Sequence, residues 1–117
     1  MKPNKNCCLC PRLCEYRTEN QKIYPSWYNA PVESFGDING NLLVVGLAPG
    51  LRGANRTGRP FPGDWAGDLL YKALDKFRFS RGQYAGEASD GLVLENCRIT
   101  NAVRCLPPQN KPIGQEI

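Results

Sequence analysis

Two apolar runs stand out from an otherwise mixed pattern of hydrophobic and polar positions. The run LLVVGLA, which begins at Leu42, is continuous over the length of a strand, and this pattern is typical of a central parallel strand covered on both faces. The segment RITNAVRC, from Arg98, is rich in β-branched residues and predicts a second buried strand. We therefore expect a sheet built around these two segments.

The segment DWAGDLLYKALDKF, between the two predicted strands, has the apolar spacing of an amphipathic helix. Its apolar residues recur at i, i+3, i+4 and i+7, namely Leu70, Ala73, Leu74 and Phe77. Acidic residues lie near its start and basic residues at its end, an order that suits the helix dipole. Strand, loop, helix and strand in this order predict a βαβ core and an α/β fold.

The remaining segments are predicted to be mostly irregular. A short helix is expected from Pro11 to Arg17, and residues 21–41 are expected to wrap the surface as a loop that ends in a turn. The tripeptide LVL at 92–94 predicts a short strand, and the tail after the paired prolines can open a helix at IGQEI.

Composition excludes several classes of protein and mechanism. The 117 residues, 41% of them hydrophobic and 22% charged, suit one small globular domain. No stretch approaches the roughly 20 apolar residues of a membrane span, and the N-terminus lacks the apolar core of a signal peptide, so we expect a cytoplasmic protein without a membrane partner. The chain has no histidine, which excludes Ser-His-Asp and Cys-His catalysis within it.

The most unusual stretch is GLAPGLRGANRTGRPFPGD, residues 46–64, directly after the first predicted strand. Its glycines let backbone N–H groups approach a ligand, and ligands of open parallel sheets bind beyond the carboxyl ends of the strands. It has neither a Walker A nor a dinucleotide fingerprint, so the loop predicts a different ligand. A net charge of +4 fits a nucleic-acid partner without requiring one, and three loop arginines can bind phosphates, namely Arg52, Arg56 and Arg59.

Six cysteines raise the question of metal binding. Four of them crowd together at positions 7, 8, 10 and 14, too close to pair sensibly with one another, and in a reducing compartment such a cluster indicates a metal site. Cys7 and Cys10 have the spacing of a ligand pair for zinc or an iron–sulfur cluster. Two interpretations stay open for Cys8, Cys14 and Cys97, which are either ordinary buried thiols or part of a local four-thiolate site.

Three motifs occur in order along the chain. They are CxxCPRLxxYR from Cys7 to Arg17, GLAPG followed by NRTGRPFPGD in the loop, and ITNAVRCxPPxNKP from Ile99 to Pro112. Together they resemble the uracil-DNA glycosylase superfamily, most closely the iron–sulfur type 5 enzymes. The resemblance implies a three-layer α/β/α fold with a central parallel sheet, truncated at the C-terminus, in which residues 1–117 form the N-terminal portion of a single glycosylase domain.

The resemblance also implies a function and a set of site residues. The function is excision of uracil, and of other deaminated bases, from DNA by a monomeric, monofunctional glycosidase in base excision repair. Asp64 would position or activate water, Phe61 would stack on the flipped base, and Asn101 would pair with the uracil edge. The implied substrate-binding residues are Gly46, Ala48, Gly50, Asn55, Phe61 and Asn101.

Each implied role has a plain structural alternative. Asp64 is also placed to cap the following helix, Phe61 lies beside prolines and suits the core, and Asn101 can satisfy local backbone groups. Asn55 is expected either to brace the loop or to touch phosphate.

A 4Fe–4S cluster is the cofactor that the resemblance implies, with Cys7, Cys10 and Cys105 as ligands and a fourth cysteine expected beyond Ile117. The family's C-terminal half, with its histidine-containing motif, is also absent from these 117 residues, so we expect the isolated chain to be inactive. The rival interpretation is a small zinc-binding nucleic-acid module without catalysis, in which Cys97 joins the same three cysteines around Zn²⁺.

Overall fold

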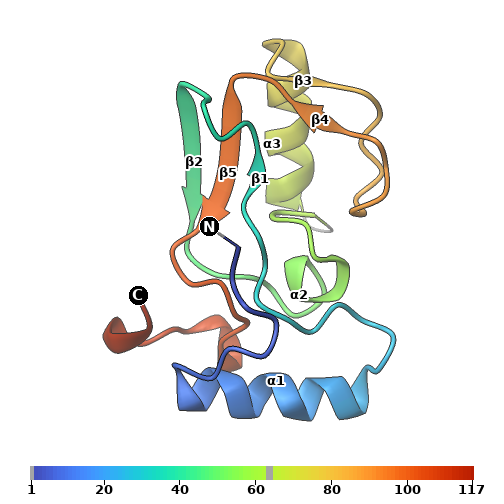
Figure 1. Ribbon diagram of the computed structural model, residues 1–117. Helices are drawn as coiled ribbons and strands as arrows, with labels where there is room; N and C mark the ends of the chain where they lie inside the picture. Colours follow the sequence, from blue (N-terminus) through green and yellow to red (C-terminus); the bar gives the residue numbers. More distant parts are fainter. Residues whose placement is uncertain (1, 63–64) are drawn as a thin grey trace.

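The computed structural model describes residues 2–62 and 65–117 and shows a mixed α/β fold (Figure 1). The elements follow in the order α1 (Pro11–Ile23), β1 (Phe35–Gly36), β2 (Leu42–Gly46), α2 (Ala54–Thr57), α3 (Trp65–Lys76), β3 (Ser80–Arg81), β4 (Val93–Leu94), β5 (Cys97–Asn101) and two 3₁₀ turns, η1 (Pro108–Asn110) and η2 (Gly114–Glu116). Within these residues, none of the helices has the length and apolar character that a bilayer span requires.

The main sheet has three strands in the order β1-β5-β2. The two predicted strands are confirmed: β2 runs parallel to β5, with Val44 opposite Ile99 and Gly46 opposite Asn101. The sheet is mixed, however, because Phe35–Gly36 adds to the other side of β5 in the antiparallel sense. The predicted central parallel sheet is therefore confirmed for β2 and β5, whereas β1, in a segment expected to be loop, makes the sheet mixed.

The core lies between the sheet and α3. Ile99 is fully buried there, and Tyr71 and Leu74 of α3 pack against it together with Leu94 of β4. The predicted amphipathic helix is therefore confirmed, but Phe77 is 66% exposed because α3 ends one residue before it.

The opposite face of β2 is open to solvent. Leu43 and Val45 are 58% and 57% exposed, while the residues that alternate with them pack toward α3. The expectation of a strand covered on both faces is wrong for the described residues, and the apolar run instead has the two-residue alternation of a half-covered strand. A second helical layer thus stays a prediction.

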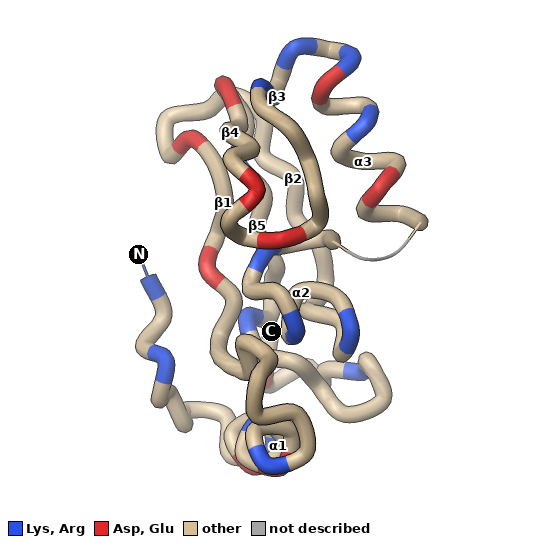
Figure 2. Tube along the Cα trace, turned by 90° about the vertical axis from the view of Figure 1, so that its right-hand side faces the viewer, with Lys and Arg blue, Asp and Glu red and all other residues tan. Residues whose placement is uncertain are grey.

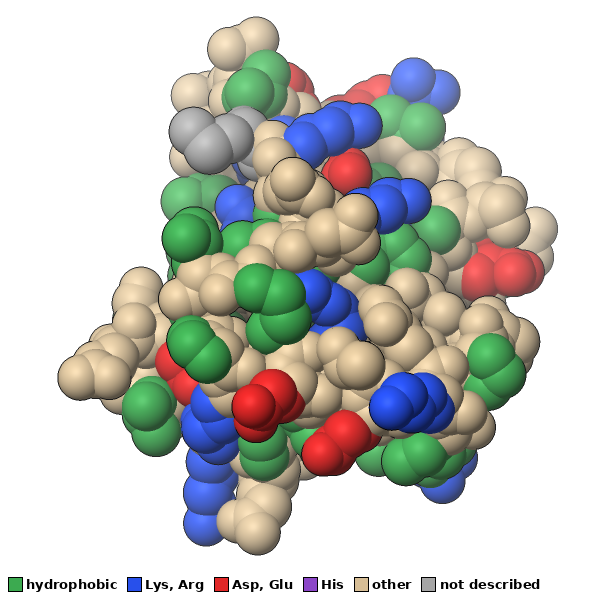
Figure 3. Space-filling view, turned by 60° about the horizontal axis from the view of Figure 1, so that its bottom comes forward, with side chains coloured by type: hydrophobic (Ala, Val, Ile, Leu, Met, Phe, Trp, Pro, Cys, Tyr) green, Lys and Arg blue, Asp and Glu red, His purple; other side chains and the backbone are tan. Residues whose placement is uncertain are grey.

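The N-terminal helix is longer than predicted, since α1 continues past Arg17 to Ile23. It lies at the end of the molecule beyond the sheet (Figure 1), where basic, acidic and hydrophobic side chains are interspersed on the surface (Figure 3). The chain's last turn is tied to it by a two-pronged contact: the Arg12 guanidinium donates hydrogen bonds of 2.8 Å to both carboxylate oxygens of Glu116.

Candidate functional site

A pocket of about 510 Å³ opens at the carboxyl ends of β2 and β5. Parallel strands present these ends at one edge of the sheet, so the loops that follow them meet there. Its lining residues are Leu47, Ala48, Pro49, Gly50, Leu51, Arg52, Gly53, Ala54, Phe61, Pro62, Asn101 and Asn110. Four of the predicted substrate-binding residues are among them, namely Ala48, Gly50, Phe61 and Asn101.

Gly46 supports the wall of this pocket. A Cβ atom at Gly46 would come within 3.0 Å of the Phe61 ring and of Asn101 Oδ1. Only a glycine therefore lets the aromatic ring and the amide approach each other across the end of β2. Sequence reasoning expected this backbone to contact the ligand, whereas the structure places it in contact with the two side chains that face the pocket.

Phe61 is held in an unusual backbone conformation. Its φ is +60°, in the left-handed region that bulky residues rarely adopt. Pro60 and Pro62, on either side, are fully buried, and the Tyr71 hydroxyl donates a hydrogen bond to the Pro60 carbonyl. Burial raises the pKa of Tyr71, which keeps this hydroxyl a donor. The ring thus lies at the pocket wall on a segment fixed from α3.

Asn55 does not line the pocket. It is 2% exposed in α2, where its side-chain amide donates to Asn29 Oδ1 at 3.0 Å and its carbonyl accepts from the Asn29 N–H at 2.9 Å. Of the two roles left open for Asn55, bracing the loop is the one that this geometry supports.

The three loop arginines separate into different environments. Basic residues gather around α2 (Figure 2), where Arg56 is exposed and Arg52 lines the pocket, its guanidinium 5.9 Å from the centre of the Trp27 ring. Arg59 is only 4% exposed and binds Asp90, so its predicted availability to phosphate is wrong. Asp64, the predicted catalytic carboxylate, lies outside the described residues.

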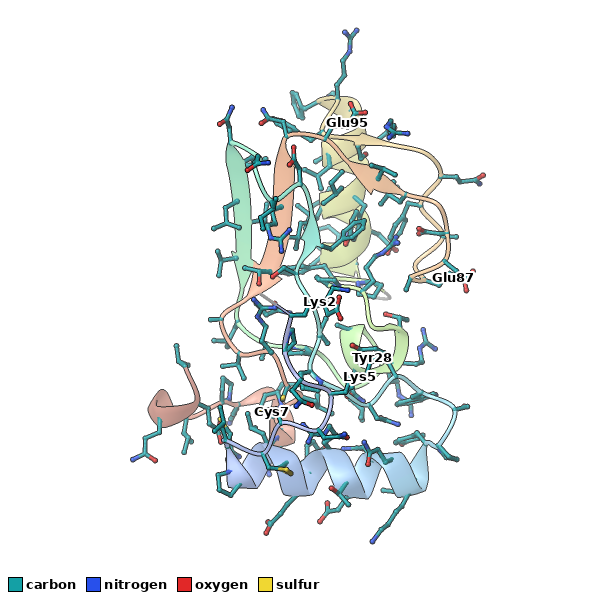
Figure 4. The ribbon with its side chains drawn as sticks, viewed as in Figure 1. Lys2, Lys5, Cys7, Tyr28, Glu87 and Glu95 are labelled. Atoms are coloured by element: carbon teal, nitrogen blue, oxygen red, sulfur yellow. A yellow bond between two sulfur atoms is a disulfide. The ribbon has the colours of Figure 1, made fainter. Side chains whose placement is uncertain are left out.

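The cysteines of the N-terminal segment meet Cys105 at the buried Arg17. The Arg17 guanidinium donates to the Cys7 carbonyl at 2.7 Å and lies 3.8 Å from Cys105 Sγ. Figure 4 places Cys7 on the N-terminal segment next to α1. Burial raises the pKa of Cys105, Arg17 opposes that rise, and the thiols of Cys7 and Cys10 add to it. The three predicted ligands are therefore neighbours.

Cys8 and Cys14 form a disulfide, with their Cα atoms 5.1 Å apart. The prediction that no two of the crowded cysteines pair is wrong, because the turn into α1 brings these two within the usual Cα separation of a disulfide. Neither is thus a thiolate ligand in this structure.

Cys97 is fully buried in the core beside Tyr71 and Leu74, and burial raises the pKa of its thiol. It begins β5, whereas Cys105 follows the other end of that strand. The predicted four-cysteine zinc site is therefore wrong, since its members lie in different parts of the molecule.

The fit of these residues to an iron–sulfur cluster is partial. Thiolates are the ligands that such clusters use, and three free thiols, Cys7, Cys10 and Cys105, lie in one region. Across residues 2–62 and 65–117, however, no three Cys, His, Asp or Glu side chains are arranged to hold a metal ion.

Comparison with known proteins decides the family. The family model described as the Uracil DNA glycosylase superfamily matches residues 33–117. The chain belongs to this superfamily. The loop motif, the motif from Ile99 to Pro112 and the residues that line the pocket all lie within the matched region, whereas the Cys7–Arg17 motif precedes it.

Several curated relatives of this chain are type-5 uracil-DNA glycosylases. That of Pyrobaculum aerophilum is 42% identical over 116 residues, which cover 96% of this chain and 51% of the relative. Those of Thermus thermophilus and Mycobacterium leprae are each 43% identical over 117 residues, covering 95% and 94% of this chain and 52% and 51% of the relatives. The chain spans about half the length of these relatives.

Sequence reasoning missed several residues that shape the site. Tyr71 was part of the predicted helix but not of the site, and Asp90 lay in a segment expected to be loop. Asn110, in the PPQNKP motif, lines the pocket with a φ of +57°. Its place in a quoted motif was a usable signal, whereas nothing local in the sequence links Arg59 to Asp90, which are 31 residues apart.

Proposed function

We propose that this chain forms the N-terminal portion of a type 5 uracil-DNA glycosylase domain, which releases uracil and other deaminated bases from DNA by hydrolysing the N-glycosidic bond. The observation that carries the proposal is the pocket at the ends of β2 and β5, where an aromatic ring, an amide and bare backbone converge. Similarity to type-5 relatives supports it. The proposed fold has three layers, with a further segment covering Leu43 and Val45.

The pocket suits a flipped base. Its volume of about 510 Å³ is within the range of roughly 300–1,000 Å³ that small-molecule sites have. Phe61 offers a ring face for stacking, and the Asn101 amide offers one donor and one acceptor group, as the edge of uracil requires. The loop at Ala48 and Gly50 lets the backbone approach the ligand.

Asp64 is the proposed catalytic carboxylate. It follows the Phe61 segment and precedes α3 in the sequence, and a carboxylate is a group that can position or activate the attacking water. Electrostatic stabilisation of the departing base anion would come from the pocket's donors.

A 4Fe–4S cluster is the proposed cofactor, with Cys7, Cys10 and Cys105 as three of its ligands. The contacts of Arg17 with the Cys7 carbonyl and the Cys105 thiol support this set, since they hold the N-terminal segment beside the segment after β5. The cluster would clamp these two segments together, and glycosidic hydrolysis needs no electron from it.

The enzymatic part of the proposal is tested by fusing residues 1–117 to the C-terminal half of the Thermus thermophilus relative. Excision is followed on a labelled oligonucleotide that contains one deoxyuridine, with alkaline cleavage of the abasic product. We expect the fusion to release uracil and the isolated chain to release none. Asp64→Ala should slow release sharply at nearly unchanged DNA binding, whereas Asp75→Ala, which removes an exposed carboxylate of α3, should change neither.

Two outcomes would contradict this part. A folded fusion that binds DNA but leaves uracil in place would refute the activity. Unchanged turnover of the Asp64→Ala fusion would remove Asp64 from the mechanism.

The cofactor is tested separately by iron and acid-labile sulfide analysis of the fusion after anaerobic reconstitution. Cys7→Ser, Cys10→Ser and Cys105→Ser should each lower the bound iron, and Cys97→Ser, in the core, serves as the matched control. Equal iron content in all four variants would refute the proposed ligand set.

A further inference from the structure

A buried ion pair joins the loop that carries Phe61 to the loop between β3 and β4. Arg59 Nη1 lies 2.6 Å from both carboxylate oxygens of Asp90, and the two side chains are 3% and 0% exposed. The guanidinium also donates to the Ala88 carbonyl at 3.2 Å and lies 4.4 Å from the centre of the Phe35 ring. Arg59 is therefore held in one orientation by groups from two other segments.

Asp90 is as fully bound as its partner. Its carboxylate accepts backbone hydrogen bonds from Ala85 at 2.9 Å and Leu92 at 3.0 Å, which fold its own loop around it. Burial alone would raise the pKa of Asp90, but these N–H groups and the Arg59 guanidinium together outweigh burial and lower it. The carboxylate thus stays charged and ties Ala85 and Leu92 to Asp90, so that residues 85–92 form an anchor around it.

Arg59, to which this anchor binds, lies two residues before Phe61 in the chain. A bulky residue at φ +60° carries a strain of roughly 1–2 kcal/mol, so the flanking chain must hold it in place. Tyr71 holds the Pro60 carbonyl from α3, and Asp90 holds Arg59, the residue before Pro60, from the β3–β4 loop. The strained residue is thus fixed through two contacts that come from different elements.

Stability alone is a poor explanation for this pair. Removing two charges from water costs about as much as their attraction returns, so a buried ion pair contributes little net stability, but it does fix geometry. Because Nη1 contacts both carboxylate oxygens of Asp90 and Nη2 donates to the Ala88 carbonyl, the planar guanidinium is fixed in distance and orientation together. This geometry suits a positioning role for residues 59–62.

We propose that Arg59 and Asp90 are positioning residues that lock the Phe61 backbone, so that its ring faces Gly46 and Asn101 across the pocket. One consequence rests on the proposed function: if Phe61 stacks on a flipped base, the β3–β4 loop, through Asp90, determines how well the Phe61 ring is placed to do so. The pair itself touches no substrate.

The test is an NMR measurement on the 117-residue chain and needs no enzymatic activity. The Gly46 hydrogen that occupies the Cβ position points at the Phe61 ring, so its resonance carries a ring-current shift. Phe61→Leu gives the position of that resonance without the ring. We expect Asp90→Asn to move the resonance most of the way to the Phe61→Leu position while the backbone spectrum of β2 and β5 stays folded.

The two-stranded sheet of β3 and β4 offers a second ion pair that serves as a matched control. Arg81 and Glu95 form an exposed ion pair of 2.7 Å on β3 and just after β4, with side chains 67% and 53% exposed. Glu95→Gln makes the same chemical change as Asp90→Asn at an exposed site and should leave the Gly46 resonance in place. A folded Asp90→Asn protein with the wild-type Gly46 resonance would overturn the proposal.

Two further measurements cover a variant that fails to fold. Arg59→Lys keeps the charge and most of the buried stem but loses the second guanidinium nitrogen, which donates to the Ala88 carbonyl, and it should also displace the Gly46 resonance. In the wild-type chain, relaxation dispersion should report one common exchange rate for Phe61 and residues 85–92. Independent motion of the two segments would refute the coupling.

Titration with uracil separates this inference from the proposed function. If the variants displace the Gly46 resonance but uracil perturbs neither Gly46 nor Asn101 in the wild type, the positioning role stands and base binding by this pocket fails. If uracil perturbs both residues equally in wild type and Asp90→Asn, base binding stands and the positioning role fails.

Discussion

At the pocket wall, Gly46 lies against the Phe61 ring and the Asn101 side chain, so Gly46→Ala tests this contact directly. The added methyl group would come within 3.0 Å of the Phe61 ring and of Asn101 Oδ1, closer than real Cβ atoms come to other heavy atoms. Their backbones restrict how far the two side chains can move, because Phe61 lies between two buried prolines and Asn101 is 6% exposed in β5. The methyl group must therefore displace the ring or spread β2 and β5 apart.

The expected magnitude follows from overpacking. An extra methylene-sized group in a packed region costs about 1–3 kcal/mol of folding free energy. Gly50→Ala is the matched control, since nothing lies within 4 Å of its added Cβ. The loss of glycine entropy in the unfolded chain is shared by both substitutions, so their difference isolates the clash.

Urea unfolding followed by tryptophan fluorescence measures this difference directly. We expect the free energy of unfolding of Gly46→Ala to fall by about 1–3 kcal/mol and that of Gly50→Ala to stay within about 0.5 kcal/mol of wild type. Adding Phe61→Leu should relieve part of the loss at Gly46, as contacting residues show coupled effects. Equal stabilities of the two alanine variants, or strictly additive effects with Phe61→Leu, would refute the contact.

Three further predictions concern the surroundings of the site. Tyr71→Phe leaves the buried Pro60 carbonyl without its donor and should lower the free energy of unfolding by about 1–3 kcal/mol in the same urea assay. Ile99→Ala, at a fully buried position, should lower it by about 2–5 kcal/mol, and a smaller loss would contradict the packing. Hydrogen bonds from Arg12 lower the pKa of Glu116, so the tail contact should persist above the ordinary carboxyl value and loosen as pH falls through the lowered pKa. Amide exchange of residues 113–117 against pH measures this loosening, and Arg12→Gln should weaken its pH dependence to the part that comes from the Ile113 N–H, which also binds the Glu116 carboxylate.

The parts of the fold that sequence patterns predicted are those with strong local signals. The apolar run from Leu42 and the β-branched residues around Ile99 indicated β2 and β5, and helical spacing indicated α3. The short strand Phe35–Gly36 has no local pattern, because it forms by pairing with residues 62 to 64 positions away in the chain. Covering of β2 on both faces was inferred from apolar character alone, which does not reveal what packs against a strand.

The site residues likewise fall into those that local sequence signals predicted and those that they did not. Glycines after a strand and an amide at the end of the next strand indicated a ligand pocket, and Phe61, Ala48, Gly50 and Asn101 do line one. Asn55 was assigned to the pocket because it lies in the same loop, yet the four-residue helix α2 turns its side chain to Asn29. Burial of individual loop residues depends on such turns and is not written in local composition.

The open side of β2 has a practical consequence for handling the chain. In the described residues β2 pairs with β5 on one side only, and its exposed face presents Leu43 and Val45. An edge strand with apolar side chains is a template for adding a strand from another molecule, including a second copy. Concentrated preparations of residues 1–117 are therefore expected to self-associate along this edge, and a fusion that supplies a neighbouring strand should raise the concentration at which the protein stays dispersed.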